Sequence, residues 1–119
     1  MYDADRRKHP RFKVSVSVEI NVEGDHTPIR WVTSDISLDG CYVESMFPFP
    51  VGTSLELKLQ LETTLVILAK VVTSYPQVGN GIRFVRILPE DLDELRSFLG
   101  SLVMRETAET QPSSICNYQ

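Results

Sequence analysis

Residues 12–23 alternate strictly between apolar and polar side chains, and this period of two constrains the fold more than any other feature of the chain. The apolar members of the stretch are Phe12, Val14, Val16, Val18, Ile20 and Val22. Successive side chains of a β-strand point to opposite faces, so the alternation predicts a strand with one buried face. The same period returns at 55–61, where leucines alternate with polar residues. We therefore expect a sheet with one apolar face.

Turn residues divide the first part of the chain into six such segments. Strands are predicted at 12–23, 29–34, 41–45, 55–61, 65–75 and 81–87. The stretches between them are rich in Gly, Pro, Asp and Asn, which is typical of turns. Six short strands predict a small antiparallel barrel or a sandwich, and closure into a barrel would remove the exposed sheet edges.

The hydrophobic period changes after Pro89. The apolar positions that follow are Leu92, Leu95, Phe98, Leu99, Leu102 and Val103, which have the spacing of one helical face. Pro89 suits the first helical position, and Glu90 and Asp91 place negative charge at the positive end of the helix dipole. The pattern predicts an all-β domain over 12–105 whose C-terminal helix covers an open end, followed by a disordered tail over 106–119.

Composition restricts the classes of function. The chain has 119 residues, which suits one domain, and a formal net charge of −4, which argues against the broad basic face that DNA binding requires. It contains no apolar run long enough to span a membrane. The first ten residues lack the apolar core of a signal peptide, so we expect a cytoplasmic protein.

Catalytic signatures are weak. The sequence contains neither a phosphate-binding GxxxxGK[ST] loop nor a GxSxG elbow. His9 and His26 lie in predicted loops and are not spaced as metal ligands, and Cys41 and Cys116 are read as two reduced thiols. We expect no enzyme activity, no metal and no cofactor.

Positive charge is concentrated near the N-terminus. Five of the twelve Lys and Arg residues lie within residues 6–13, namely Arg6, Arg7, Lys8, Arg11 and Lys13. Pro10 disfavours a helix there, so residues 1–11 are predicted to form a flexible arm that leads into the first strand. A guanidinium group offers a planar fork that matches phosphate oxygens or the O6/N7 edge of guanine. The arm is thus a candidate site for a small anionic ligand, although a plain solubilising tail would look the same.

A second candidate is the segment Asp35-Ile36-Ser37-Leu38-Asp39-Gly40. The carboxylate of Asp35 can accept hydrogen bonds from the N1–H and N2–H₂ edge of guanine, and the hydroxyl of Ser37 can donate or accept. Gly40 is a residue without Cβ strain where the chain reverses. An ordinary turn has the same residue types, so this segment alone is a weak signal.

Together, the two segments resemble the PilZ domain family, the bacterial receptors for cyclic di-GMP. That family carries RxxxR just before its first strand and [D/N]xSxxG after its second. They stand here as the run from Arg7 to Arg11 and the run from Asp35 to Gly40. The segment GNGIRFVRI at 79–87 also looks like the final strand of the family. The resemblance covers about residues 6–103.

The resemblance implies a six-stranded antiparallel β-barrel with one C-terminal α-helix. It also implies that Arg7 and Arg11 bind phosphates and guanine edges, that Asp35 and Ser37 contact a guanine, and that Gly40 shapes the loop. In the family, an arginine at the position of Arg6 goes with an intercalated dimer of the ligand. We add Arg83 on the last strand as a further candidate that could face the same surface.

These observations predict a non-enzymatic cyclic di-GMP receptor. Since the chain has no output domain of its own, we expect an adaptor that signals to a protein partner through a ligand-induced conformational change. The alternative from another class is a PilZ-fold protein-interaction module that does not bind the nucleotide.

Overall fold

The computed structural model describes residues 10–110 of the chain, with side chains through Val103. These residues form six strands and one helix. The strands are β1 (Ser17–Val22), β2 (Ile29–Ile36), β3 (Gly40–Glu44), β4 (Ser54–Gln60), β5 (Thr64–Tyr75) and β6 (Gly79–Ile87), and the helix is α2 (Pro89–Thr110).

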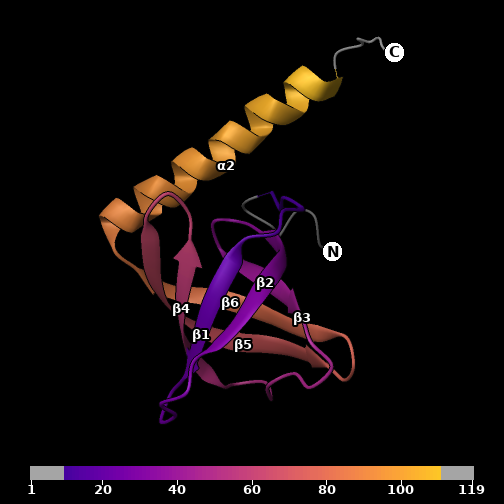
Figure 1. The fold of residues 1–119 in the computed structure, drawn as a ribbon, viewed down its shortest axis with the longest axis vertical. Coiled ribbons are helices and arrows are strands. Elements are labelled where there is room, and N and C mark those ends of the chain that lie inside the picture. Colours follow the sequence, from indigo (N-terminus) through magenta and orange to yellow (C-terminus); the bar gives the residue numbers. More distant parts are fainter. Residues whose placement is uncertain (1–9, 111–119) are drawn as a thin grey trace, which may run out of the picture.

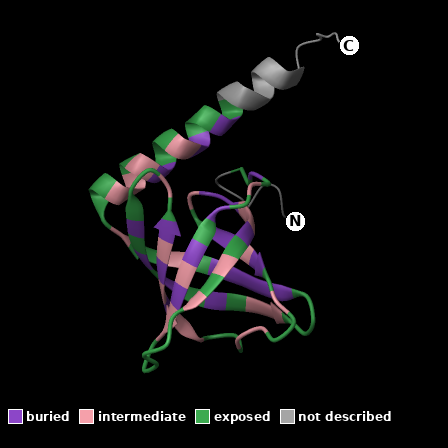
Figure 2. Ribbon diagram, viewed as in Figure 1, coloured by how far each residue is buried: buried purple, intermediate pink, exposed green. Residues whose placement is uncertain are grey.

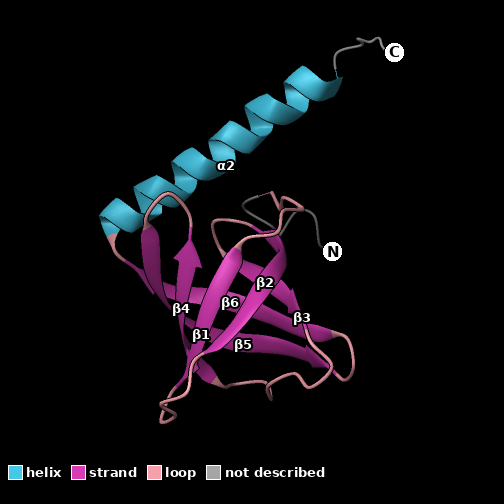
Figure 3. Cartoon of the chain, in the orientation of Figure 1, coloured by secondary structure: helices cyan, strands magenta, loops and turns pink. Residues whose placement is uncertain are grey.

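The strands form one closed antiparallel barrel in the order β1-β2-β3-β6-β5-β4 (Figures 1 and 3). Four of the six pairs join strands that are consecutive in sequence. The remaining two pairs, β3 with β6 and β1 with β4, close the sheet on itself. Closure leaves no free edge, and it confirms the barrel over the sandwich.

The inner face of the barrel is the apolar face that the alternation predicts (Figure 2). β5 shows it most regularly, because Leu65, Ile67, Ala69 and Val71 are buried while the residues between them are exposed. Ile20, Leu57 and Ile67 have no exposed surface. Burying a side chain of this size contributes about 1.5–3 kcal/mol to folding, so the interior supplies most of the stabilisation.

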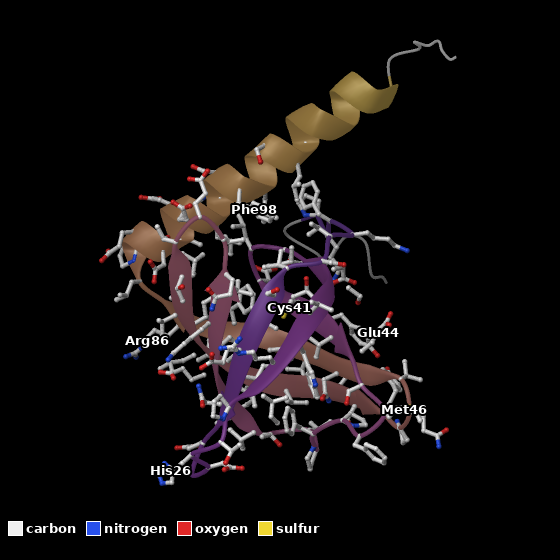
Figure 4. All side chains as sticks on the ribbon, viewed as in Figure 1. His26, Cys41, Glu44, Met46, Arg86 and Phe98 are labelled. Atoms are coloured by element: carbon white, nitrogen blue, oxygen red, sulfur yellow. The ribbon has the colours of Figure 1, made fainter. Side chains whose placement is uncertain are left out.

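Helix α2 packs its apolar face against this core. Leu95, Leu99 and Leu102 are buried, and Phe98 lies on the side of the helix toward the barrel (Figure 4). The C-terminal part of the helix extends away from the strands (Figure 1). The helix continues to Thr110, so residues 106–110, which we assigned to the tail, are helical, and 111–119 lie outside the described residues. Within the described chain, no helix is long and apolar enough to cross a membrane.

The first strand is shorter than the alternation predicts. Phe12 forms only an isolated bridge with Ile36, and regular pairing begins at Ser17. Between these points the hydroxyl of Thr33 supplies hydrogen bonds to the backbone of the segment. Its Oγ1 accepts from the Val16 N–H at 3.0 Å and donates to the Val14 carbonyl at 2.7 Å. The register of β2 with β3 also shifts between Thr33 and Asp35. Alternation thus predicted the buried face of this segment and overestimated the length of its ladder.

A buried side chain on β6 anchors the connection between β3 and β4. Asn80 is fully buried, and its amide accepts from the Phe49 N–H at 2.8 Å and donates to the carbonyls of Phe49 and Thr73 at 2.9 and 3.1 Å. The ring of Phe49 also packs on Trp31 with a centroid separation of 5.3 Å. The connection is therefore fastened to the barrel along its length.

Replacing Asn80 with alanine is expected to lower the free energy of unfolding by about 2–4 kcal/mol, because it leaves buried backbone groups of Phe49 and Thr73 without partners. Denaturant unfolding measures the change. Thr64→Ala, which removes only an exposed hydroxyl, is the control and should change stability by less than about 0.5 kcal/mol. Equal stability of Asn80→Ala and the control would contradict this role.

Candidate functional site

An ion pair joins the two sequence segments predicted to bind ligand. The Nη1 of Arg11 donates to the Oδ1 of Asp35 at 2.6 Å, across 24 positions of sequence. The two side chains are 36% and 25% exposed, so solvent screens the pair only partly. We expect residues 1–11 to form a flexible arm. This contact holds Arg11, the last of them, against the barrel.

Backbone pairing beside the ion pair explains why these side chains meet. Phe12 and Ile36 exchange two hydrogen bonds, with N···O distances of 2.9 and 3.0 Å. Both side chains point into the core, so the residues next to them in sequence, Arg11 and Asp35, are directed outward. Burial of two apolar side chains thereby positions two charged ones.

The turn between β2 and β3 is held by Ser37. Its N–H donates to the Gly40 carbonyl at 2.8 Å, its Oγ accepts from the Asp39 N–H at 3.1 Å, and the side chain is almost fully buried. We had predicted a hydroxyl that faces a guanine. In this structure the hydroxyl forms hydrogen bonds within the turn, and its contact with a guanine stays a prediction.

Gly40 is required for a different reason from the one the sequence suggested. A Cβ at this position would lie 2.1 Å from the backbone oxygen of Ile82 on β6. Gly40 therefore permits the close approach of β3 to β6. It is not needed for a left-handed backbone conformation. The predicted loop also proves shorter, because Asp35 and Ile36 belong to β2 and Gly40 begins β3.

Arg83 lies beside this turn. It stands opposite Gly40 in the register of β3 with β6, and its side chain is exposed on the outer face. Across the next pair of strands it stands opposite Lys70, which is also exposed. Neither cation forms an ion pair with the carboxylates of residues 10–103. Like charges placed directly opposite each other repel, so this pair of cations favours an anion nearby.

Sequence reasoning missed Lys70. Its position in an alternating strand shows only that it faces outward, and nothing in the sequence states which residue of β6 lies across from it. The register decides this, and it brings Lys70 into the same surface as Arg83. Tyr42 was missed for the same reason, since it stands opposite Asp35 on β3.

Arg6 and Arg7 lie outside the described residues, so their predicted roles stay predictions. The structure does bring together Arg11, Asp35, Ser37 and Gly40, with Arg83 on the adjoining strand. The described remainder of the candidate site therefore lies on the adjoining strands β2, β3 and β6, with Arg11 paired to β2.

Cys41 follows Gly40 and faces the core (Figure 4). Burial, with a smaller contribution from the nearby Asp35 carboxylate, raises the pKa of its thiol to about 12, and Arg11 acts in the opposite direction. The thiolate is the reactive form of cysteine, so this thiol is inert at neutral pH. Among the side chains described, those of residues 10–103, no cluster of His, Cys, Asp and Glu has the arrangement of a metal site.

Two surface grooves differ in how they relate to the motif residues. A shallow groove of about 990 Å³ runs over β1 and β2, lined by residues such as Glu19, Arg30 and Trp31. A smaller apolar groove of about 140 Å³ lies next to the motif turn, between Pro10, Phe12 and Leu38 on one side and Leu99 of α2 on the other. The first groove contains none of the predicted ligand-binding residues. The second joins the candidate site to the helix.

A family model described as the PilZ domain matches residues 5–101 of the chain. This span includes both motifs, all six strands and most of the described helix. The chain belongs to the PilZ domain family. PilZ domains are regulatory receptor domains. No match was found among the curated proteins.

Solved structures of PilZ proteins share the fold. The structure of YcgR in complex with c-di-GMP from Escherichia coli has a TM-score of 0.72 at 16% identity, covering 92% of this chain and 51% of that one. The Bacillus subtilis inhibitor of motility MotI/DgrA has a TM-score of 0.69 at 22% identity, covering 89% and 53%. The chain thus spans about half the length of these two proteins. The isolated PilZ domain of YcgR with c-di-GMP has a TM-score of 0.63 at 17% identity, covering 88% and 98%.

Gly40→Ala is expected to destabilise this PilZ domain by at least about 1–3 kcal/mol, because the new Cβ must push β3 away from the backbone of β6. Thermal or denaturant unfolding measures the loss. Gly100→Ala is the matched control. It meets no atom within 4 Å and should stabilise α2 by about 0.5–1 kcal/mol. The steric role of Gly40 would be refuted if both variants gained stability.

Proposed function

We propose that this PilZ domain is a receptor for cyclic di-GMP that passes the signal to a protein partner. The observation that carries the proposal is the Arg11–Asp35 ion pair, because it holds the two motif segments together at one surface. The YcgR structures that contain c-di-GMP have the same fold and support the proposal at the level of the family.

The chemistry of the pair suits a guanine dinucleotide. A guanidinium group has five N–H donors, and a carboxylate has two oxygens that accept hydrogen bonds. In this structure the contact uses one nitrogen of Arg11 and one oxygen of Asp35. The remaining donors of Arg11 suit a phosphate or the O6/N7 edge of guanine, and the remaining oxygen of Asp35 suits the N1–H and N2–H₂ edge. The pair orients both groups before the ligand arrives, which lowers the entropy lost on binding.

Charge around the pair favours a doubly negative ligand. Arg83 and Lys70 lie on the adjoining strands without carboxylate partners in the described chain, although the protein as a whole carries a net charge of −4. We propose that Arg6 and Arg7 complete this cationic surface by closing over the ligand. The mutual repulsion between Arg83 and Lys70 is then relieved by the phosphates.

The apolar groove beside the turn gives a route to a partner. Leu38 of the motif turn and Pro10 of the entering segment line it together with Leu99 and Val103 of α2. A ligand that moves the segment before β1 changes this groove and so alters the packing of α2. We propose that the partner recognises the resulting position of the helix.

Calorimetric titration with cyclic di-GMP tests the site. Arg7→Ala and Arg11→Ala should each weaken binding about ten- to a hundredfold, because each removes charge-assisted hydrogen bonds worth about 1.5–3 kcal/mol. Arg30→Ala is the control, since Arg30 lies on the outer face of β2 near Glu19 and should leave the affinity unchanged.

A double variant separates direct binding from mere neutralisation of Asp35. If Arg11 binds the ligand itself, Arg11→Ala/Asp35→Ala remains weak, whereas recovery of wild-type affinity would show that Arg11 only offsets the carboxylate. Absence of any binding to the wild-type protein would favour the interaction module that does not bind the nucleotide.

The stoichiometry tests Arg6. Two stacked cyclic dinucleotides bring four phosphate charges together, and a third guanidinium can offset their repulsion and stack on an exposed guanine. We therefore expect two ligands per chain at saturation, falling toward one in Arg6→Leu while binding persists. A wild-type value of one ligand would refute this role of Arg6 and leave the receptor proposal intact.

A further inference from the structure

The apolar groove beside the motif turn has room for one aromatic ring. Its volume is about 140 Å³, and an apolar cavity of about 150 Å³ in a protein is enough to hold benzene. Leu38 of the motif turn lines one side of it, and Leu99, Gly100 and Val103 of α2 line the other. Val103 is 46% exposed, so part of this apolar lining is accessible to a further apolar group.

A cation of α2 borders this groove. Arg96 lines it, and its side chain is 57% exposed. Its Nη1 lies 3.7 Å from the Oδ1 of Asp93, which is a long contact between two exposed side chains three positions apart on one helix. Pairs of this kind contribute little to stability. The guanidinium of Arg96 therefore remains able to bind a carboxylate, or to lie on an aromatic ring, at the mouth of the groove.

The described chain begins at the groove itself. Pro10 is the first described residue, and it lines the groove together with Phe12. Figure 1 shows this beginning of the chain at the end of the barrel that faces α2. Tyr2 lies eight positions before Pro10, and eight residues reach about 26 Å when extended. The segment before Pro10 is therefore long enough to turn back and place a side chain in the groove.

Residues 1–9 divide into two parts of different chemistry. Residues 6–9 read RRKH and are basic, whereas residues 1–5 read MYDAD and carry the carboxylates of Asp3 and Asp5. Tyr2 is the only Phe, Tyr or Trp among these nine residues. The basic part suits the anionic ligand proposed above, which would repel the two carboxylates. Residues 1–5 instead match a surface that combines an apolar groove with a cation.

We propose that residues 1–5 dock in this groove, with the ring of Tyr2 between the motif turn and α2. The carboxylates of Asp3 and Asp5 then lie beside Arg96. Because the occupant belongs to the same chain, docking needs no large interface. A short tether holds the segment at an effective concentration on the order of millimolar, so the contact of one ring and one cation is populated.

Docking of this segment connects the ligand site to the helix. This consequence rests on the proposed function, whereas the docking itself does not. Tyr2 and Arg7 are five positions apart, so a ligand that draws Arg7 toward the motif ion pair also pulls on Tyr2. The ring lies against α2, and its displacement therefore changes the surroundings of Leu99.

Nuclear Overhauser contacts in the full chain without ligand test the docking. The ring protons of Tyr2 should show contacts with the methyl groups of Leu99 and Val103. Tyr2→Ser should abolish these contacts and shift the resonances of both methyl-bearing residues, because the ring is removed from beside them. Gly100→Leu should also abolish the contacts, because its side chain enters the open space of the groove, where a Cβ meets no atom within 4 Å.

Tyr118→Ser is the matched control, because it removes the tyrosine of residues 111–119 and leaves residues 1–5 intact. It should leave the methyl resonances of Leu99 and Val103 unchanged. The proposal is overturned if Tyr2 shows no contact with these methyl groups, or if Tyr118→Ser is the variant that shifts them. Contacts that fade on dilution would place the segment on a second copy and would also overturn it.

Titration with cyclic di-GMP tests the connection to the ligand site. Saturating ligand should shift the methyl resonances of Leu99 in the wild type, and it should shift them less in Tyr2→Ser. Equal shifts in the two proteins would overturn the connection. Absence of any binding to the wild type would overturn the proposed function, while the contacts measured without ligand still decide the docking.

Discussion

Closure of the barrel between β3 and β6 is the constraint on which the rest of the structure depends. These strands are separated in sequence by β4 and β5, so their pairing brings together parts of the chain that local structure would leave apart. It requires Gly40, because any side chain there would meet the backbone of Ile82. The same pairing sets Arg83 beside the motif turn. One steric requirement thus closes the fold and assembles the candidate site.

The charges within that site are balanced by the positions of the side chains relative to one another and not by burial. Arg11 and Asp35 neutralise each other at 2.6 Å, while Arg83 and Lys70 face each other as like charges. A ligand that replaced part of the first contact would lose some ion-pair energy, which is modest for a partly exposed pair. It would gain by relieving the repulsion between Arg83 and Lys70. The cyclic dinucleotide that we propose as the ligand carries both phosphate charges and base edges, which is the chemistry that these two pairs suit.

The two ends of β3 have different physical characters. At the Gly40 end, the motif turn is polar and adjoins the cationic outer face of β6. At the Glu44 end, the connecting loop is charge-free and is fastened by the buried amide of Asn80. A rigid barrel separates the two, so events at one end reach the other only through the strands. Helix α2, by contrast, lines the same apolar groove as Leu38 of the motif turn. A movement of the turn would therefore act on α2 directly.

The sequence by itself determined which residues face the core, how many strands form, where the helix begins and which motif residues belong together. Those properties depend on periodicity and on local side-chain chemistry, both of which are present in a linear chain. Tertiary structure alone decided the strand order, the Arg11–Asp35 contact, the steric need for Gly40, the burial of Ser37 and the meeting of Lys70 with Arg83. Alternation states which way a side chain points and leaves open which strand lies next to it. That choice is made only when all the strands compete to bury one common core.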